Sequence, residues 1–182
     1  MPLIRSTMKY IPLFALLSML LTGCFLKPTE PAPSKPKTKT KPSNTASTAS
    51  MRFRYGVVDD AEQFVGSPYK YAGRDPKTGF DCSGFTSFVL ARHNVKVSTA
   101  SAAQSKEGRE VPLDKVLPGD LVFFSQNGST VSHVGLVVSR GKDGIVCVHS
   151  TTSRGVIVEN VSQSSYWKTK ILYARDVIGA KR

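Results

Sequence analysis

The chain has 182 residues, a formal net charge of +12, 40% apolar residues and 9% aromatic residues. This length fits one globular domain and excludes a large multidomain enzyme, and the apolar content excludes a wholly disordered chain. Three cysteines, an odd number, exclude a complete set of disulfides, and no CxxC motif indicates a zinc finger.

Residues 1–23 have the features of a bacterial export signal. Arg5 and Lys9 precede an apolar run over residues 11–21, which is too short to span a bilayer about 30 Å thick. The run leads into the sequence LTGC, which resembles the lipobox at which a signal is cut before a cysteine that is then diacylated. We therefore expect a lipoprotein signal peptide and a lipid anchor at Cys24. An ordinary signal peptide followed by a chance cysteine is the alternative.

Residues 24–50 are rich in Pro, Ser, Thr, Ala and Lys and have almost nothing to bury, so we expect a lipidated cysteine followed by a disordered tether. Five lysines stand against one glutamate here, and with the two cationic residues of the signal they leave only half of the +12 charge on residues 51–182. No RNA-binding motif accompanies the charge, so we expect no nucleic-acid partner. A basic tether is better suited to anionic lipid or cell-wall polymer.

Helical patterns occupy the first half of residues 51–182. Apolar residues recur at helical spacing over residues 57–65, and the Gly-Ser-Pro sequence that follows cannot continue a helix. After a loop rich in Tyr and Gly, Asp81 has a side chain suited to an N-cap, so we predict a helix from Cys82 to about His93. A polar segment over residues 99–107 predicts a short third helix.

Strand patterns occupy the second half. Apolar runs separated by glycines predict five antiparallel strands, at residues 121–124, 133–139, 145–149, 156–161 and 171–177. Helices followed by strands predict a compact two-layer α+β domain.

Two of the three histidines lie on neighbouring predicted strands: His133 begins one and His149 ends the next. A hairpin centred at Gly141 would make them direct cross-strand neighbours, with Cβ atoms about 4.5–5.5 Å apart. This spacing alone is equally compatible with a site and with two unconnected surface histidines.

The position of Cys82 favours the interpretation that the two histidines belong to a functional site. A thiol at a helix N-terminus lies near free N–H groups and the positive end of the helix dipole, which lower its pKa. A histidine packed against that helix can take the thiol proton and pass it to a leaving group. The pattern predicts Cys82 as nucleophile, His133 as base and acid, and His149 as the group that orients His133. The alternative for Cys82 is a small buried residue.

Cys147 has no role in this scheme. The hairpin centred at Gly141 places it opposite Gly135, and a buried core position is the simplest interpretation. A disulfide with Cys82 and a zinc site made by the two cysteines with His133 and His149 are the alternatives. We expect no metal and no cofactor.

Five motifs together resemble the NlpC family of bacterial cell-wall cysteine peptidases. They are GSPY at residues 66–69, GFDCSGF at 79–85, GDLVFF at 119–124, SHVG at 132–135 and VHS at 148–150. The resemblance covers nearly all of residues 55–180. It implies that residues 51–182 form a papain-like catalytic domain, in which N-terminal helices pack on an antiparallel sheet of about five strands.

The resemblance also implies an activity. It implies a Cys-His-His triad at Cys82, His133 and His149, which hydrolyses peptidoglycan stem peptides at D-glutamyl or diaminopimelyl bonds through an acyl-enzyme. Three further positions match residues that help to receive the substrate: Tyr69, Asp81 and Ser83.

We therefore expect a monomeric, lipid-anchored endopeptidase that faces the periplasm from the outer membrane. The outer membrane is implied by the resemblance, because Phe25 rather than an aspartate follows Cys24. Two alternatives belong to other classes: a non-catalytic cell-wall-binding lipoprotein, and a papain-like amidase or acyltransferase with another substrate.

Overall fold

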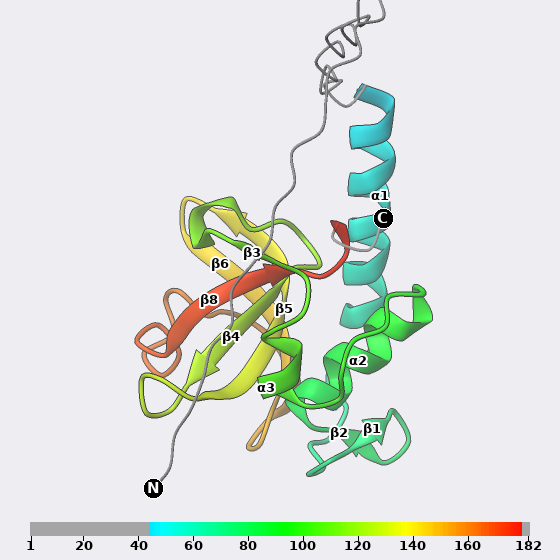
Figure 1. The fold of residues 1–182 in the computed structure, drawn as a ribbon. Coiled ribbons are helices and arrows are strands. Elements are labelled where there is room, and N and C mark those ends of the chain that lie inside the picture. The colour runs from blue at the N-terminus through cyan, green and yellow to red at the C-terminus, as the bar shows by residue number, and fades with distance from the viewer. Residues whose placement is uncertain (1–43, 180–182) are drawn as a thin grey trace, which may run out of the picture. The chain divides into compact units, whose positions relative to one another are not determined.

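The structure, a computed structural model, describes residues 44–179 (Figure 1). The predicted signal peptide, Cys24 and most of the predicted tether lie outside these residues. The helices are α1 (Asn44–Glu62), α2 (Cys82–Arg92) and α3 (Ser101–Gln104), with a 3-10 turn, η1, at Leu113–Lys115. The strands are β1 (Arg74–Asp75), β2 (Gly79–Phe80), β3 (Arg109–Val111), β4 (Leu121–Ser125), β5 (Val131–Gly141), β6 (Gly144–Thr151), β7 (Gly155–Asn160) and β8 (Ile171–Asp176).

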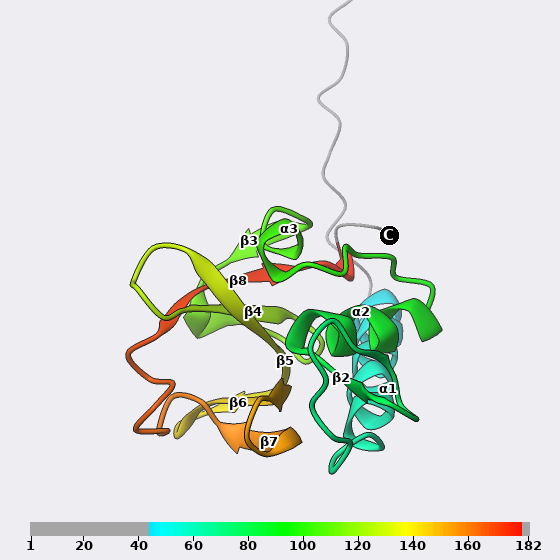
Figure 2. The same cartoon turned by 90° about the horizontal axis from the view of Figure 1, so that it is seen from below.

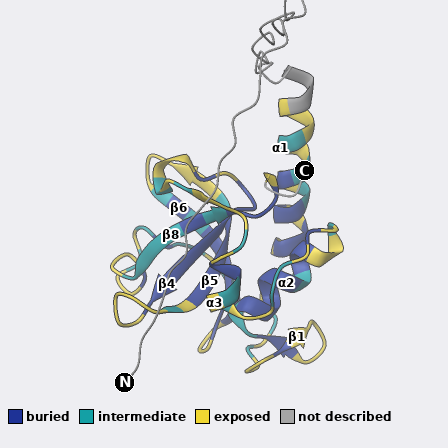
Figure 3. Cartoon of the chain, viewed as in Figure 1, coloured by how far each residue is buried: buried dark blue, intermediate teal, exposed yellow. Residues whose placement is uncertain are grey.

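Helix α1 is longer than predicted. It begins at Asn44 rather than at residue 57, so residues 44–50 are helical and not part of an extended tether. Its buried residues belong to the C-terminal half, whereas residues 47–49 are exposed (Figure 3). Packing of the C-terminal half supplies the costly nucleus, after which each further residue of this Ala-, Ser- and Thr-rich segment is added at little cost. Among the described residues, no helix is long and apolar enough to cross a membrane.

The predicted antiparallel α+β fold is confirmed. Its main sheet has the strand order β3-β8-β4-β5-β6-β7, and every pairing within it is antiparallel. Five of these strands were predicted, and the sixth, β3, is a short and mostly exposed strand at the sheet edge without a period-two apolar pattern. The sheet is strongly curved, with β4 and β8 on one side, β6 and β7 on the other, and β5 between them (Figure 2).

The curvature gives the sheet a core on each face. One core lies between the sheet and helices α1 and α2, and it contains Phe80, Phe85 and Phe123. The other lies inside the curve of the sheet and contains Phe124, Cys147 and Trp167. Burial on both faces explains why β4 has an unbroken apolar sequence instead of an alternating one.

The β5–β6 hairpin has a different register from the predicted one. Gly141 pairs with Gly144, so the turn is formed by residues 142 and 143 instead of being centred at Gly141. Gly144, with φ at 105°, supplies the left-handed backbone that follows this tight turn. A register shift between Val137 and Ser139 then brings Leu136 opposite Val148. The predicted direct pairing of the two histidines is therefore wrong.

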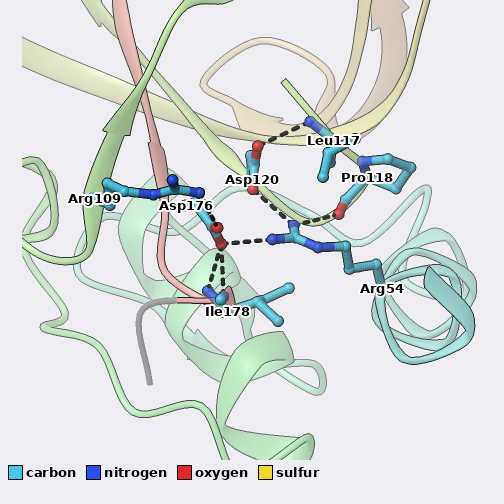
Figure 4. Close-up of polar contacts among 8 residues, drawn as sticks. Arg54, Arg109, Leu117, Pro118, Asp120, Asp176 and Ile178 are labelled. Carbon is cyan, nitrogen blue, oxygen red and sulfur yellow. Dashed lines mark hydrogen bonds and ion pairs between the residues drawn. The ribbon is translucent and has the colours of Figure 1, made fainter. Parts of the chain in front are cut away.

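A buried ion network joins α1 to the sheet (Figure 4). The Arg54 guanidinium lies 2.7 Å from an Asp120 carboxylate oxygen and 2.6 Å from one of Asp176, and it donates to the Pro118 carbonyl at 3.0 Å. All three charged side chains are almost completely buried. The network fixes the start of β4 and the end of β8 on the helix.

The two carboxylates differ in their surroundings. Burial raises the pKa of Asp120, although the Leu117 N–H and the Arg54 guanidinium oppose this rise. Burial alone would also raise the pKa of Asp176, but the Gly179 N–H and Arg54 hold it below its usual range. Arg54 is thus the cation that makes both buried charges tolerable.

Arg54→Met should lower the free energy of unfolding by about 3–5 kcal/mol, because it leaves buried Asp120 without a cation and Asp176 with only the exposed Arg109. Urea denaturation followed by circular dichroism measures the change. Arg52→Met, at an exposed position of the same helix, is the matched control. Equal urea midpoints for the two variants would contradict a stabilising role for the network.

Candidate active site

Cys82 is the first residue of α2, as predicted. The Asp81 carboxylate caps the helix by accepting from the Gly84 N–H at 2.6 Å. Phe80, which precedes Asp81, is held by β6, because the Ser150 hydroxyl donates to the Phe80 carbonyl at 2.7 Å. A cap on one side and a strand contact on the other fix the position of the thiol.

Strands β5 and β6 separate beside this thiol. Their last paired residues are Leu136 and Val148, beyond which the ladder ends. The Val134 N–H, which a continued ladder would use, instead bonds to the Cys82 sulfur. The first turn of α2 therefore meets the sheet where its hydrogen bonding is open.

Burial raises the pKa of the Cys82 thiol, and the N–H groups of Val134, Ser83 and Cys82 itself only partly oppose it. The expectation that the helix N-terminus would depress this pKa is therefore wrong. The N–H groups lower the pKa as expected, but the loss of water around the sulfur, together with the charge of Asp81, outweighs them. The resting cysteine is a protonated thiol at neutral pH, and it needs a base.

The structure brings the two histidines together, although the register predicted for their strands is wrong. The His133 Nε2 atom lies 2.9 Å from His149 Nδ1, and both rings are buried. They project from the same face of the two strands, and Gly135 lies between them without a side chain. A Cβ at Gly135 would lie 3.4 Å from the His149 Cβ. The histidines are thus diagonal rather than direct neighbours.

The environment of His133 strongly favours a neutral ring. Burial, followed by the neighbouring His149, lowers the pKa of His133 to about 3. Trp167 stacks on the ring, with centroids 4.5 Å apart and an angle of 20° between planes, and Phe124 lies 5.5 Å away. His133 therefore packs against two aromatic rings and is unprotonated, so it is free to accept a proton.

A cavity of about 390 Å³ opens onto these groups. Cys82 and His133 both line it, together with Tyr69, Arg154 and Trp167. Burial, with the nearby Cys82, raises the pKa of Tyr69, so its hydroxyl remains a hydrogen-bond donor beside the thiol.

Asp81 and Ser83, the other two predicted substrate contacts, do not line this cavity. Asp81 is engaged as the helix cap. The Ser83 hydroxyl lies 3.1 Å from an Asp81 carboxylate oxygen and 2.9 Å from the Thr99 carbonyl, and Ser83 is buried. Their role in receiving substrate stays a prediction.

Cys147 is fully buried in the core inside the curved sheet. Burial, with the charge of Glu159 second, raises the pKa of its thiol. It pairs with Val137, not with Gly135 as predicted. Cys82 and Cys147 are both free thiols, and residues 44–179 contain no group of three or more His, Cys, Asp or Glu side chains arranged to hold a metal ion.

Sequence reasoning missed Glu159. Its carboxylate oxygen lies 3.0 Å from His149 Nε2, on the side of the ring away from His133. In the β6–β7 hairpin His149 pairs with Ile157 and Cys147 with Glu159, so the two side chains are diagonal neighbours. Pairing the predicted strands across the turn at residues 152–154 would have found it.

Alkylation of Cys82 by iodoacetamide should show a pH midpoint above 9.0, the ordinary thiol value, because burial disfavours the thiolate. Mass spectrometry of the modified peptide as a function of pH measures this midpoint. Cys147 is the internal control and should stay unmodified until the chain unfolds. A Cys82 midpoint near 7 would instead indicate a resting thiolate.

The pattern of the NlpC/P60 family matches residues 66–176 of the chain. The chain is 36% identical over 124 residues to "Gamma-DL-glutamyl hydrolase" of Bacillus subtilis (strain 168), a match that covers 66% of the chain and 29% of that protein. It is 30% identical over 141 residues to "Probable endopeptidase NlpC" of Escherichia coli (strain K12), covering 76% of the chain and 88% of the relative.

A solved structure has the same fold. An NlpC/P60 family protein from Bacillus cereus superposes with a TM-score of 0.60 and 30% identity, covering 66% of the chain and 40% of that protein. The family pattern spans both strands that bear the histidines and the helix that bears Cys82. The chain therefore belongs to the NlpC/P60 family.

Proposed function

We propose that the chain is a peptidoglycan hydrolase, a cysteine endopeptidase that cleaves stem-peptide bonds of D-glutamate or diaminopimelate. The observation that carries the proposal is the cavity in which the Cys82 thiol and His133 lie together, with His149 bonded behind His133 at 2.9 Å. The names of the B. subtilis and E. coli relatives, a glutamyl hydrolase and a probable endopeptidase, support this class of reaction.

The first step is formation of an acyl-enzyme. The Cys82 sulfur attacks the carbonyl carbon of the scissile amide as its proton moves to His133, and the carbonyl electron pair moves onto oxygen. His133 then donates that proton to the leaving amine as the C–N bond breaks. His149 holds the ring of His133 in the orientation that both transfers need.

The developing oxyanion needs hydrogen-bond donors beside Cys82. The N–H groups of Cys82 and Ser83, which already lie against the sulfur at the start of α2, and the side chain of Tyr69 in the cavity wall supply them. Water, deprotonated by His133, then attacks the thioester and releases the acid product and the free thiol.

The wall of the cavity suits an acidic peptide. Arg154 lines it and is 56% exposed, and its guanidinium has more N–H donors than its bond to Glu159 uses. A carboxylate of D-glutamate or diaminopimelate is a fitting partner for these donors. Substrate recognition is thus proposed to rest on Arg154 and Tyr69, which both line the cavity.

We infer that the enzyme is held at the cell envelope. Residues 1–23 act as a lipoprotein signal peptide, Cys24 carries the lipid, and the outer membrane holds the domain facing the periplasm. The basic segment after Cys24 lies along anionic lipid or cell-wall polymer. No further partner and no cofactor enter the mechanism.

Cys82→Ala should reduce the release of stem-peptide fragments from purified sacculi at least about a thousandfold, because it removes the nucleophile. Mass spectrometry of the released muropeptides measures the loss and identifies the bond that is cut. Cys147→Ala, which removes the buried thiol outside the cavity, is the matched control and should retain activity. Undiminished release by the Cys82 variant would refute the mechanism. Binding to sacculi without cleavage by the unaltered protein would identify a cell-wall-binding protein instead.

Cys24→Ala should move the protein from the membrane fraction to the soluble envelope fraction, because the lipid attachment atom is lost. Immunoblotting of separated membranes measures the distribution, and metabolic labelling with a fatty acid checks the modification itself. Cys82→Ala should leave both readouts unchanged. Retention of label by the Cys24 variant would contradict the anchor.

A further inference from the structure

Glu159 has an unusual set of partners for a side chain that is 18% exposed. A single oxygen, Oε1, lies 3.0 Å from His149 Nε2 and accepts from the Trp167 indole N–H and from an Arg154 N–H, each at 2.9 Å. These donors come from β6, from the segment after β7 and from the β6–β7 turn. One acceptor therefore ties together three segments around the histidine pair.

The carboxylate fixes the direction of every hydrogen bond in the chain of rings. A carboxylate only accepts, so His149 must donate from Nε2, and its Nδ1 in the neutral ring must be an acceptor. His133 therefore donates from Nε2 to His149 Nδ1, which lies 2.9 Å away. The Nδ1 atom of neutral His133 is left as the acceptor for the Cys82 proton.

Glu159 also supplies the charge that this site lacks. Burial lowers the pKa of His149, while the charge of Glu159 and its hydrogen bond act in the opposite direction. The proposed mechanism places a positive charge on His133, although burial strongly opposes it. The Glu159 carboxylate is connected to His133 through His149 by two hydrogen bonds. Its negative charge stabilises the His133 cation once the proton has moved.

The Trp167 contact adds a second route to the same ring. Its indole donates to Glu159 and stacks on His133, with 4.5 Å between ring centroids. Glu159 thus holds His133 from two sides, through His149 at its edge and through Trp167 at its face. No other carboxylate among the described residues makes these contacts.

We propose that Glu159 is a positioning residue that completes a Cys82–His133–His149–Glu159 relay, fixing the tautomers of both histidines and stabilising the imidazolium formed when Cys82 gives up its proton. This relay depends on the proposed function only for the reaction that it would serve. The relay itself concerns the Cys82 proton and is present without substrate.

Several titratable or charged groups lie around the two histidines. His133 on β5 and Glu159 on β7 contact His149, Cys147 lies two residues before it on β6, Arg154 acts on it from the β6–β7 turn, and Cys82 and Tyr69 line the cavity with His133. Glu159 and Arg154 act on His149 with opposite sign, since the charge of Arg154 lowers the pKa of His149. The two can therefore be separated by substitution.

Glu159→Gln keeps the size and an acceptor oxygen but removes the charge. The rate of Cys82 alkylation by iodoacetamide in the full chain should fall at least about tenfold near pH 7, the equivalent of one pKa unit. The deficit should disappear above the thiol pKa, where the thiolate forms without help from His133. Glu159→Asp, which keeps the charge, should restore part of the rate at pH 7.

Two control variants sharpen this test. Glu110→Gln removes a carboxylate from edge strand β3, where it is 63% exposed and paired with Arg175, and should alkylate like the unaltered chain at every pH. Arg154→Met removes the opposing charge and should alkylate faster near pH 7. A Glu159→Gln rate equal to that of Glu110→Gln, or a deficit of the same size at every pH, would overturn the relay. A loss in Arg154→Met as large as that in Glu159→Gln would do so as well.

Nitrogen NMR of the chain with labelled histidine reads the tautomers directly, and only three histidines contribute. His133 and His149 should both be Nε2–H tautomers in the unaltered chain, and the His149 imidazolium should form at lower pH in Glu159→Gln. A neutral His149 protonated on Nδ1 would overturn the relay. Because neither alkylation nor NMR involves peptidoglycan, a chain that fails to cut sacculi but passes these tests would refute the substrate and not the relay.

Discussion

The separation of β5 from β6 beyond Leu136 and Val148 is the constraint on which the site depends. Two strands that stayed paired would satisfy the Val134 N–H within the sheet and leave no place for a helix end. Because they part, the first turn of α2 contributes the Cys82 sulfur to that N–H, while β6 holds the Phe80 carbonyl, two residues before Cys82, through Ser150. The open end of the ladder thus converts an unsatisfied backbone group into a contact with the thiol.

The curvature of the sheet explains why the thiol and the imidazoles of the resting site are uncharged. Cys82 packs against the core shared with the helices, whereas the histidines face the core inside the curve, beside Phe124 and Trp167. Both environments are poor in water, so each favours a neutral side chain: a thiol and an unprotonated imidazole. A charge-separated pair can then arise only with help, and Glu159 is the carboxylate placed to give it.

Stability and the proposed chemistry use different buried charges. Arg54 neutralises two carboxylates where α1 meets the sheet and lines no part of the cavity. Glu159 on β7 serves the histidines through His149 and remains partly exposed. A fully enclosed ion network suits a fixed joint between helix and sheet. A carboxylate near solvent can respond when the charge of its neighbour changes.

The sequence by itself determined the α+β class, five of the six main strands, the start of α2 at Cys82 and the grouping of Cys82 with two histidines. These depend on local chemistry: an Asp cap, apolar runs and turn residues. The three-dimensional structure decided the β5–β6 register, the extension of α1 and the raised thiol pKa. A bulge inside a hairpin, a helix propagated from its packed half and a sulfur desolvated by a strand distant in sequence leave no periodic signal in the chain.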